Sequence, residues 1–374
     1  MHDVFAREFL VKPAGPDCNL ACDYCFYRGK YDLFPDSERR MNDAVLELMI
    51  KQIMAPGSEL VSISWQGGEP TLMGLPFFYR AVEYMEKYGR GITIGNGFQT
   101  NGLLLDKKWI KFFKKFNFLV GISLDGPEHV HDHYRRTAGG LGTWSRVSRQ
   151  AKLMLDSGVD VNVLSVVHDY AADFPDEIYG FHKELGLGYM QFIPCLITDP
   201  QITEGSAFYS VSAEKYGNFL CRIFDLWMSD FVEGRQTTSI RFFESLLYSY
   251  KGLAPPDCTL SPECGSYLVI EHDGDVFVCD FFVEKQWRLG NLRETNLNDF
   301  LKSEMLLGFK RLKQNLPYEC LVCRWLKHCY GGCTRYRIRD PHEKSCNRFC
   351  NAFKIFFSHA DEHLRRLAID LIKI

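Results

Sequence analysis

Fourteen cysteines, gathered mainly in two parts of the chain, constrain this 374-residue sequence more than any other feature. Three of them lie within residues 18–25, and nine lie from residue 258 onward. A reducing cytoplasm keeps thiols from pairing stably, so cysteines at this density in a long chain are better explained as metal ligands than as disulfides. We therefore expect the chain to fold around metal centres.

Charge and hydropathy limit where the chain works and what it binds. It has 44 basic and 47 acidic residues, a net charge of −3, which argues against binding nucleic acid or an anionic membrane by bulk charge. Residues 1–8 include charged side chains where a secretion signal would be apolar, and no run of 18 apolar residues occurs. We expect a cytoplasmic globular protein with no membrane or nucleic-acid partner.

The first 200 residues alternate short β-branched or aromatic runs with longer segments of helical period, which is typical of parallel strands joined by crossover helices. The predicted strands cover residues 7–12, 60–66, 91–99, 118–124, 159–167 and 188–194. The predicted helices between them cover residues 43–54, 107–116 and 173–185. A full eight-unit barrel takes about 250 residues. The fold class is therefore α/β, and the pattern predicts a partial (β/α)6 TIM-like barrel.

The composition changes in the last third of the chain. Helices are predicted over residues 213–232 and 240–250, and Pro255-Pro256 marks a break after them. The segment from His272 to Asp275 is a hairpin-turn sequence between short strands. We expect two domains, the partial barrel over residues 1–235 and a cysteine-rich domain with a C-terminal helix over residues 236–374.

The N-terminal cysteines form a C-x3-C-x2-C motif, Cys18, Cys22 and Cys25, directly after the first predicted strand. A 4Fe–4S cubane has four iron corners, so three thiolates leave one iron open to a ligand that is not protein. A zinc site would instead need a fourth protein ligand close by, and chance spacing is the other alternative. The motif favours chemistry at an open iron.

With Tyr24 before its last cysteine, this motif resembles the cluster loop of radical S-adenosylmethionine (SAM) enzymes. The resemblance implies that the open iron binds the methionine part of SAM and that reduction gives a 5′-deoxyadenosyl radical. The segment Gly67-Gly68-Glu69-Pro70 similarly resembles the family's GGEP segment, which receives the methionine amino group. By resemblance, the cofactor contacts are Tyr24, Gly68, Glu69, Ser123, Arg135 and Leu196.

Two of these residues also have an interpretation other than cofactor binding. Leu196 could belong to the core. Arg135 lies beside His129, His131 and His133, a cluster that invites a metal-site interpretation, although loop histidines are usually solvated.

The C-terminal cysteines follow a pattern that resembles the SPASM extension of radical SAM enzymes. The resemblance implies two auxiliary 4Fe–4S clusters, three clusters in all. One would be held by Cys258, Cys264, Cys279 and Cys333, and the other by Cys320, Cys323, Cys329 and Cys350. Cys346 competes with Cys350 for the last position, Cys195 and Cys221 receive no role, and spacing alone does not exclude zinc.

Among SPASM enzymes, the sequence resembles the anaerobic sulfatase-maturating enzymes over nearly its whole length. The segments that carry this resemblance are Lys12-Pro13, Cys18 to Tyr27, Gln66 to Thr71, Gln99 to Gly102, Cys279 to Phe281 and Trp287 to Asn291. The family oxidises a cysteine or serine of a sulfatase to Cα-formylglycine without oxygen. It implies an unfolded or nascent sulfatase polypeptide as substrate, an electron donor such as flavodoxin or ferredoxin, and Asp280 as catalytic base.

Three alternatives stay open. The first is another SPASM peptide maturase that forms thioether or carbon–carbon crosslinks or epimerises residues. Such enzymes often carry an additional N-terminal peptide-binding domain, for which the seventeen residues before Cys18 leave no room. The second is an electron carrier, which would gain nothing from an incomplete ligand set, and the third is a zinc-stabilised interaction protein. The sequence does not choose between a cysteine and a serine substrate.

Overall fold

The computed structural model describes residues 8–34, 39–54, 59–196, 209–233, 235–338 and 346–370, so residue 7 of the first predicted strand lies outside the described residues. Contacts divide the chain into two compact units. The first unit comprises Met1–Ser123, Arg136–Val161 and Gly265–Lys310. The second unit comprises Leu124–Arg135, Asn162–Cys264 and Arg311–Ile374. Part of the C-terminal third thus packs with the N-terminal residues.

A seven-stranded run of sheet organises the first unit. Its order is β12 (Arg288–Asn291), β11 (Asp275–Phe277), β10 (Leu268–Glu271), β1 (Glu8–Lys12), β2 (Leu60–Trp65), β3 (Thr93–Thr100) and β4 (Phe118–Ser123). Strands β1 to β4 are parallel, β10 joins β1 in parallel, and β10, β11 and β12 pair antiparallel. The helices of this unit include α1 (Asp43–Ile53), α2 (Gly74–Tyr88), α3 (Lys107–Lys115) and α5 (Trp144–Asp156).

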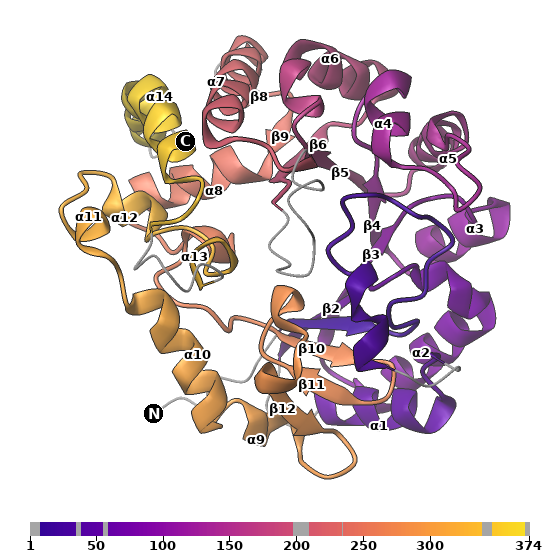
Figure 1. The fold of residues 1–374 in the computed structure, drawn as a ribbon. Coiled ribbons are helices and arrows are strands. Elements are labelled where there is room, and N and C mark those ends of the chain that lie inside the picture. Colours follow the sequence, from indigo (N-terminus) through magenta and orange to yellow (C-terminus); the bar gives the residue numbers. More distant parts are fainter. Residues whose placement is uncertain are drawn as a thin grey trace. The chain divides into compact units, whose positions relative to one another are not determined.

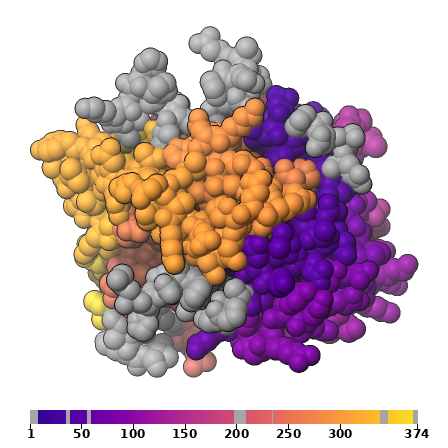
Figure 2. Space-filling model, turned by 90° about the horizontal axis from the view of Figure 1, so that it is seen from below, coloured from indigo at the N-terminus to yellow at the C-terminus, as the bar shows by residue number. Residues whose placement is uncertain are grey.

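The pairing of β1 with β10 joins residues from opposite ends of the sequence. Phe9 lies opposite Leu268 and Lys12 lies opposite Glu271. Figure 1 shows the β10–β12 segment in orange beside the indigo start of the chain, and in Figure 2 their surfaces adjoin. The C-terminal segment therefore extends the parallel sheet at its first strand.

Local sequence explains why these elements form where they do. Asn42 and Asp106 cap α1 and α3 by accepting hydrogen bonds from backbone N–H groups of the first turn. Aromatic side chains from α2, α3, β3 and β4 fill the space between sheet and helices, with Phe78, Phe98 and Phe112 each at most 1% exposed. Burial of these rings holds the helices on the sheet.

The second unit contains parallel strands β5 (Val161–Val167), β6 (Tyr189–Pro194) and β9 (Ser239–Ile240). Its longer helices are α4 (Glu128–Tyr134), α6 (Pro175–Leu185), α7 (Ala213–Ser229), α8 (Arg241–Tyr250) and α14 (Cys350–Asp370). The short helices α11 (Tyr318–Leu321) and α12 (Leu326–Cys329) carry cysteines of the C-terminal array. Helices α7 and α14 pack closely because Gly217 of α7 faces Ala352 without a side chain.

The sequence-based predictions of local structure are confirmed with small shifts. All six predicted strands form, their described ends lie within two residues of the predicted limits, and the α/β class with parallel strands is correct. The predicted helix over residues 213–232 is too long. It ends at Ser229, and Phe231–Val232 instead pair as β7 with β8 (Arg235–Gln236). Asp230 accepts hydrogen bonds from Tyr179 and Lys183, which holds the chain where it leaves the helix.

The division at residues 235 and 236 stays a prediction. Among the helices of the described ranges, none has the length and apolar character that crossing a membrane requires.

Candidate active site

The loop after β1 brings the three cysteines of the N-terminal motif together. Burial of the sulfur is the largest cause that raises the pKa of the Cys18 thiol to about 12, and the charge of Glu69 adds to it. Cys22 and Cys25 lie close enough for their negative charges to raise this pKa as well. The backbone N–H of Leu20 also donates to the Cys18 sulfur, at 3.4 Å. Three thiolates this close repel one another unless a positively charged group lies among them, so the donor set fits an iron cluster.

The glycine segment after β2 is fixed directly on this loop. The N–H of Gly68 donates to Gly15 O at 2.8 Å, and the N–H of Glu69 donates to Asp17 O at 2.8 Å. A Cβ on Gly68 would lie only 1.9 Å from Asp17 O, so the close approach requires glycine. The ends of β1 and β2 therefore form one rigid edge around the cysteines.

Glu69 is a buried carboxylate that ties the ends of β2 and β3 together. It is 1% exposed and accepts hydrogen bonds from the Thr71 hydroxyl, the Thr100 hydroxyl and the Asn101 N–H, at 2.6, 2.8 and 2.8 Å. Burial raises the pKa of Glu69, while these hydrogen bonds lower it. Asn101 in turn donates to the Cys18 sulfur at 3.7 Å, so Glu69 supports the cysteine loop from the end of β3.

Tyr24 and Ser123, two further predicted cofactor contacts, also lie in the first unit. Tyr24 is half-buried in the cysteine loop. Ser123 ends β4, and its hydroxyl accepts a hydrogen bond from Gln99 of β3 at 2.9 Å. Four predicted contacts, Tyr24, Gly68, Glu69 and Ser123, are thus at or beyond the carboxyl ends of neighbouring parallel strands, where barrel enzymes carry their active sites.

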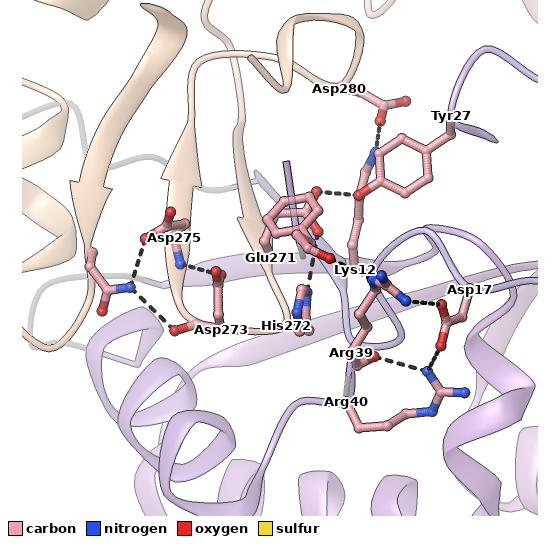
Figure 3. A network of polar contacts seen from close by, with 12 residues as sticks. Lys12, Asp17, Tyr27, Arg39, Arg40, Glu271, His272, Asp273, Asp275 and Asp280 are labelled. Atoms are coloured by element: carbon pink, nitrogen blue, oxygen red, sulfur yellow. Dashed lines mark hydrogen bonds and ion pairs between the residues drawn. The ribbon is translucent and has the colours of Figure 1, made fainter. Parts of the chain in front are cut away.

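Asp280, the predicted base, follows β11 and is largely buried rather than solvated. Its side chain is 14% exposed, one carboxylate oxygen lies 2.5 Å from Lys12 Nζ, and the other accepts a hydrogen bond from Gln66 at 3.2 Å. Figure 3 shows Asp280 and Lys12 pointing toward each other. The segment also contacts the cysteine loop, because the rings of Phe281 and Phe26 pack with centroids 4.8 Å apart.

In the second unit, Arg135 is held by a buried carboxylate. Its guanidinium donates to Asp125 at 3.0 Å, and Asp125, which is 0% exposed, also accepts from the backbone N–H of Val166 at 2.9 Å. The backbone N–H of Asp125 donates to the ring of His131 at 3.3 Å. Arg135 is therefore oriented by a fixed partner, as a binding residue requires.

The neighbouring histidines do not converge on a common point. His129 is partly exposed and pairs with Tyr170 and Glu177, His133 stacks on the Tyr170 ring, and His131 is buried. Within the described ranges, no three His, Cys, Asp or Glu side chains form a group that could hold a single metal ion. A 4Fe–4S cluster spreads its irons between the thiolates, so its cysteines lie wider apart than the ligands of one ion.

Leu196, another predicted contact, follows β6 and is half-buried. Its backbone carbonyl accepts a hydrogen bond from Arg335 at 3.2 Å, and the carbonyl of Pro194 accepts one from Tyr336 at 3.3 Å. The two donors lie two and three residues after Cys333 in the sequence. Cys195 between the two acceptors is buried, which raises the pKa of its thiol to about 12.

Three of the four cysteines predicted to hold one auxiliary cluster are neighbours in the second unit. Burial and, less strongly, the negative charges of Cys258 and Cys264 raise the pKa of the Cys333 thiol to about 12. Lys313, 1% exposed, donates to the carbonyl of Cys258 at 2.7 Å. The fourth predicted ligand, Cys279, belongs to the first unit, where the Tyr267 hydroxyl lies 3.5 Å from its sulfur.

The other predicted set lines a single cavity in the second unit. Its walls include all four predicted cysteines together with apolar rings of Trp325, Phe353 and Phe357; the four are Cys320, Cys323, Cys329 and Cys350. Cys346 does not line the cavity, although its charge raises the pKa of the thiols of Cys320 and Cys350, so it lies nearby. An apolar cavity with four thiols in its wall fits a cluster with four protein ligands.

Comparison with known proteins agrees with this geometry. Residues 13–175 match the model of the radical SAM superfamily, and residues 262–329 match that of an iron–sulfur cluster-binding domain, SPASM. A cysteine-type anaerobic sulfatase-maturating enzyme of Clostridium perfringens is 38% identical over 367 residues, which cover 96% of this chain and 98% of that protein. The chain belongs to the anaerobic sulfatase-maturating enzymes. It is a radical SAM oxidoreductase with a C-terminal SPASM domain.

Other members of this family are equally similar in sequence and in structure. A serine-type anaerobic sulfatase-maturating enzyme of Bacteroides thetaiotaomicron is 37% identical, with 95% of this chain and 89% of that protein covered. A solved structure of native anSMEcpe with bound AdoMet and Cp18Cys peptide matches with a TM-score of 0.90 and 36% identity, covering 97% of this chain and 99% of that one. Overall similarity therefore does not separate the cysteine type from the serine type.

Sequence reasoning missed several residues of this sulfatase-maturating site. Lys12 and Gln66 were part of the family resemblance but received no role, yet both contact Asp280. Asp125, which orients Arg135, was also missed. The sequence did contain a signal for Lys12, because a lysine at the end of an apolar strand is buried with it and therefore needs a buried partner.

Replacing Gly68 by alanine tests the clamp between the two loops. The new Cβ would force apart the Gly68 and Asp17 backbones, so we expect Gly68→Ala to lose about 4 of about 12 bound irons and to lose the change that SAM causes in the electron paramagnetic resonance of the reduced protein. Gly95→Ala is the matched control, because its Cβ would meet nothing nearer than 3.9 Å. Full iron content with an intact SAM response in Gly68→Ala would contradict the clamp.

Three buried histidines of the second unit predict a pH dependence of stability. Burial lowers the pKa of His131 and His182 from 6.5 to about 3, and that of His168 to about 4. Below pH 6.5 the three histidines become protonated in the unfolded chain but stay neutral in the folded protein. Their contribution to the free energy of unfolding is therefore complete above pH 6.5 and falls as the pH decreases toward 4.

Comparison with His182→Gln isolates one of these protons. Thermal unfolding is measured for both proteins from about pH 7.5 to about pH 5.5. Below the pKa of histidine in the unfolded chain, the difference in free energy of unfolding between the original protein and the variant should fall by up to ~1.4 kcal/mol per pH unit. A difference that stays constant over this range would show that His182 takes up its proton equally in both states.

Proposed function

We propose that the chain oxidises one cysteine or serine of a sulfatase polypeptide to Cα-formylglycine without oxygen. One observation carries the proposal beyond family membership. Asp280, a largely buried carboxylate beside the predicted cluster ligand Cys279, lies on a segment that packs against the N-terminal cysteine loop through Phe26 and Phe281. This position supports a role for Asp280 as a base next to the loop that would hold the reactive cofactor.

The cofactor set follows from the ligand groups of this chain. Cys18, Cys22 and Cys25 would hold the cluster with the open iron, and SAM would contact Tyr24, Gly68, Glu69, Ser123, Arg135 and Leu196. When bound, SAM and the three 4Fe–4S clusters supply the 5′-deoxyadenosyl radical and accept the electron that the substrate loses. The Glu69 carboxylate accepts four hydrogen bonds, from Thr71 in its own loop and from Thr100 and Asn101 at the end of β3, so we expect its backbone rather than its carboxylate to face the cofactor.

Asp280 would act on the substrate side chain. After a hydrogen atom has left Cβ, the neighbouring thiol or hydroxyl must lose its proton as one electron departs, and Asp280 takes that proton. A cysteine substrate then gives a thioaldehyde, which water converts to the aldehyde with release of sulfide, whereas a serine substrate gives the aldehyde directly. Gln66 and Lys12 keep the carboxylate in place for this transfer.

The auxiliary ligands are proposed as two sets of four. They are Cys258, Cys264, Cys279 and Cys333 for one cluster, and Cys320, Cys323, Cys329 and Cys350 for the other. The cavity wall supports Cys350 rather than Cys346 as the last ligand. The proposal also includes an unfolded or nascent sulfatase as partner, a flavodoxin or ferredoxin as electron donor, and a cytoplasmic location, which suits thiol ligands that must stay reduced.

A peptide assay tests the reaction and the role of Asp280. Incubation of the reconstituted enzyme with SAM, reductant and a peptide containing C-x-P-x-R or S-x-A-x-R should lower the peptide mass by about 18 or about 2, from the chemistry that the cofactor supplies. We expect Asp280→Asn to cleave SAM but to lose most peptide oxidation, by ~100-fold or more. Asp156→Asn, an exposed carboxylate of the same unit, is the control.

Each result of the assay has one meaning. Deoxyadenosine without a loss of 18 or 2 mass units in any peptide would favour a crosslinking or epimerising enzyme instead. Full peptide oxidation by Asp280→Asn would remove this residue from the mechanism while leaving the overall reaction in place.

Serine substitutions decide the last ligand of the cavity cluster. Because Cys350 lines the cavity and Cys346 does not, we expect Cys350→Ser to lose about 4 irons per chain and Cys346→Ser to keep them. Cys221→Ser, a cysteine without a proposed role, serves as the control. Iron and sulfide analysis of the anaerobically purified variants gives the answer, and the opposite pattern would assign Cys346 as the ligand.

A further inference from the structure

Lys12 is a lysine that the fold buries almost completely, with 1% of its side chain exposed at the end of β1. A buried ammonium is costly unless charges and dipoles around it compensate. Here the compensation comes from Asp280, 2.5 Å away, and from the face of the Tyr27 ring, whose centroid is 3.5 Å from Nζ. Surface lysines of the same unit differ, since Lys87 pairs with Glu47 while 57% exposed.

The groups that hold Lys12 are themselves fixed. The Tyr27 hydroxyl donates to Glu271 at 2.5 Å, and both side chains are buried. Glu271 lies opposite Lys12 in the register of β1 and β10, so the two strands set the position of the ring beneath the ammonium. Figure 3 shows Lys12 between Tyr27 and Glu271, with Asp280 beyond its tip. Lys12 is therefore anchored by the sheet.

Asp280, in contrast, sits on a short 3-10 turn after β11. Its carboxylate is held at both oxygens, by Lys12 on one and by Gln66 on the other. Both partners are fixed by the central strands. Lys12 ends β1, and Gln66 directly follows β2 and donates its backbone N–H to the carbonyl of Val11 in β1 at 2.9 Å. The sheet thus determines how a carboxylate on a loop is oriented.

We propose that Lys12 is a positioning residue for peptide oxidation, which acts by holding the Asp280 carboxylate in the orientation that receives the substrate proton. The inference rests on the proposed role of Asp280 as base. A base transfers protons only within hydrogen-bond reach, and a displacement of 1 Å can cost two orders of magnitude in rate. Without Lys12, Gln66 alone would restrain the carboxylate, and the loop would let it turn.

The test compares two products of the same reconstituted enzyme. In Lys12→Met, which keeps the side-chain length, we expect deoxyadenosine to form as before and formylglycine per deoxyadenosine to fall by ~10-fold or more. Iron content and the SAM-induced change in electron paramagnetic resonance should be retained, since neither depends on Asp280. Lys87→Met is the matched control and should leave the ratio unchanged.

A double variant separates positioning from general damage. If Lys12 acts through Asp280, adding Lys12→Met to Asp280→Asn should lower the ratio no further, whereas multiplied losses would overturn the proposal. An unchanged ratio in Lys12→Met alone would also overturn it. Should Lys12→Met lose its iron, Lys12→Arg keeps the charge and shifts the carboxylate, so its ratio must still fall for the proposal to stand.

Failure of the proposed function gives a different result. In that case the unsubstituted enzyme forms no formylglycine, and the ratio has no meaning. Melting temperatures of the two single variants and the double variant still measure the coupling between Lys12 and Asp280. We expect the two losses to be strongly non-additive, and strict additivity would show that the ion pair holds nothing in place.

Discussion

The parallel pairing of β1 with two strands is the interaction on which the first unit depends. On one side β1 pairs with β2, which positions the glycine segment against the cysteine loop, and on the other it pairs with β10, which leads to Cys279 and Asp280. Because β1 forms backbone hydrogen bonds with a neighbouring strand along each of its two edges, its register is fixed from both sides. Residues more than 250 positions apart thereby lie side by side in one sheet.

Several buried charges have matched partners, and each match fixes a segment of the candidate site. In the first unit, Glu69 is satisfied by backbone and hydroxyl donors and Lys12 by a carboxylate and an aromatic face. In the second unit, Asp125 is paired with Arg135. Removing one partner of such a pair leaves an uncompensated charge, which costs far more than the pair itself contributes to stability. These pairs are thus better understood as devices that specify position than as sources of stability.

Sequence patterns predicted what is local, including the strands and helices of the α/β region and the cysteine motifs. They did not predict the partner of β1, because periodicity within a strand carries no information about which distant segment lies beside it. The end of α7 at Ser229 was missed for a related reason, since tertiary hydrogen bonds to Asp230 override helix propensity there. Asp280 was found through its resemblance, whereas Lys12, its buried partner, needed the fold.

With its four cysteines as the proposed cluster ligands, the cavity of the second unit would link metal binding to folding. Its four cysteines come from two segments, residues 320–329 and the start of α14, and they place thiols in an apolar wall. Burial raises the pKa of the thiols of Cys320 and Cys350, so without metal these groups are driven toward the protonated form. A cluster binds the thiolate form, so its binding free energy offsets the cost of ionising a buried thiol. The packing of α14 on α7 should accordingly depend on cluster occupancy more than that of the aromatic core of the first unit, which contains no cysteine.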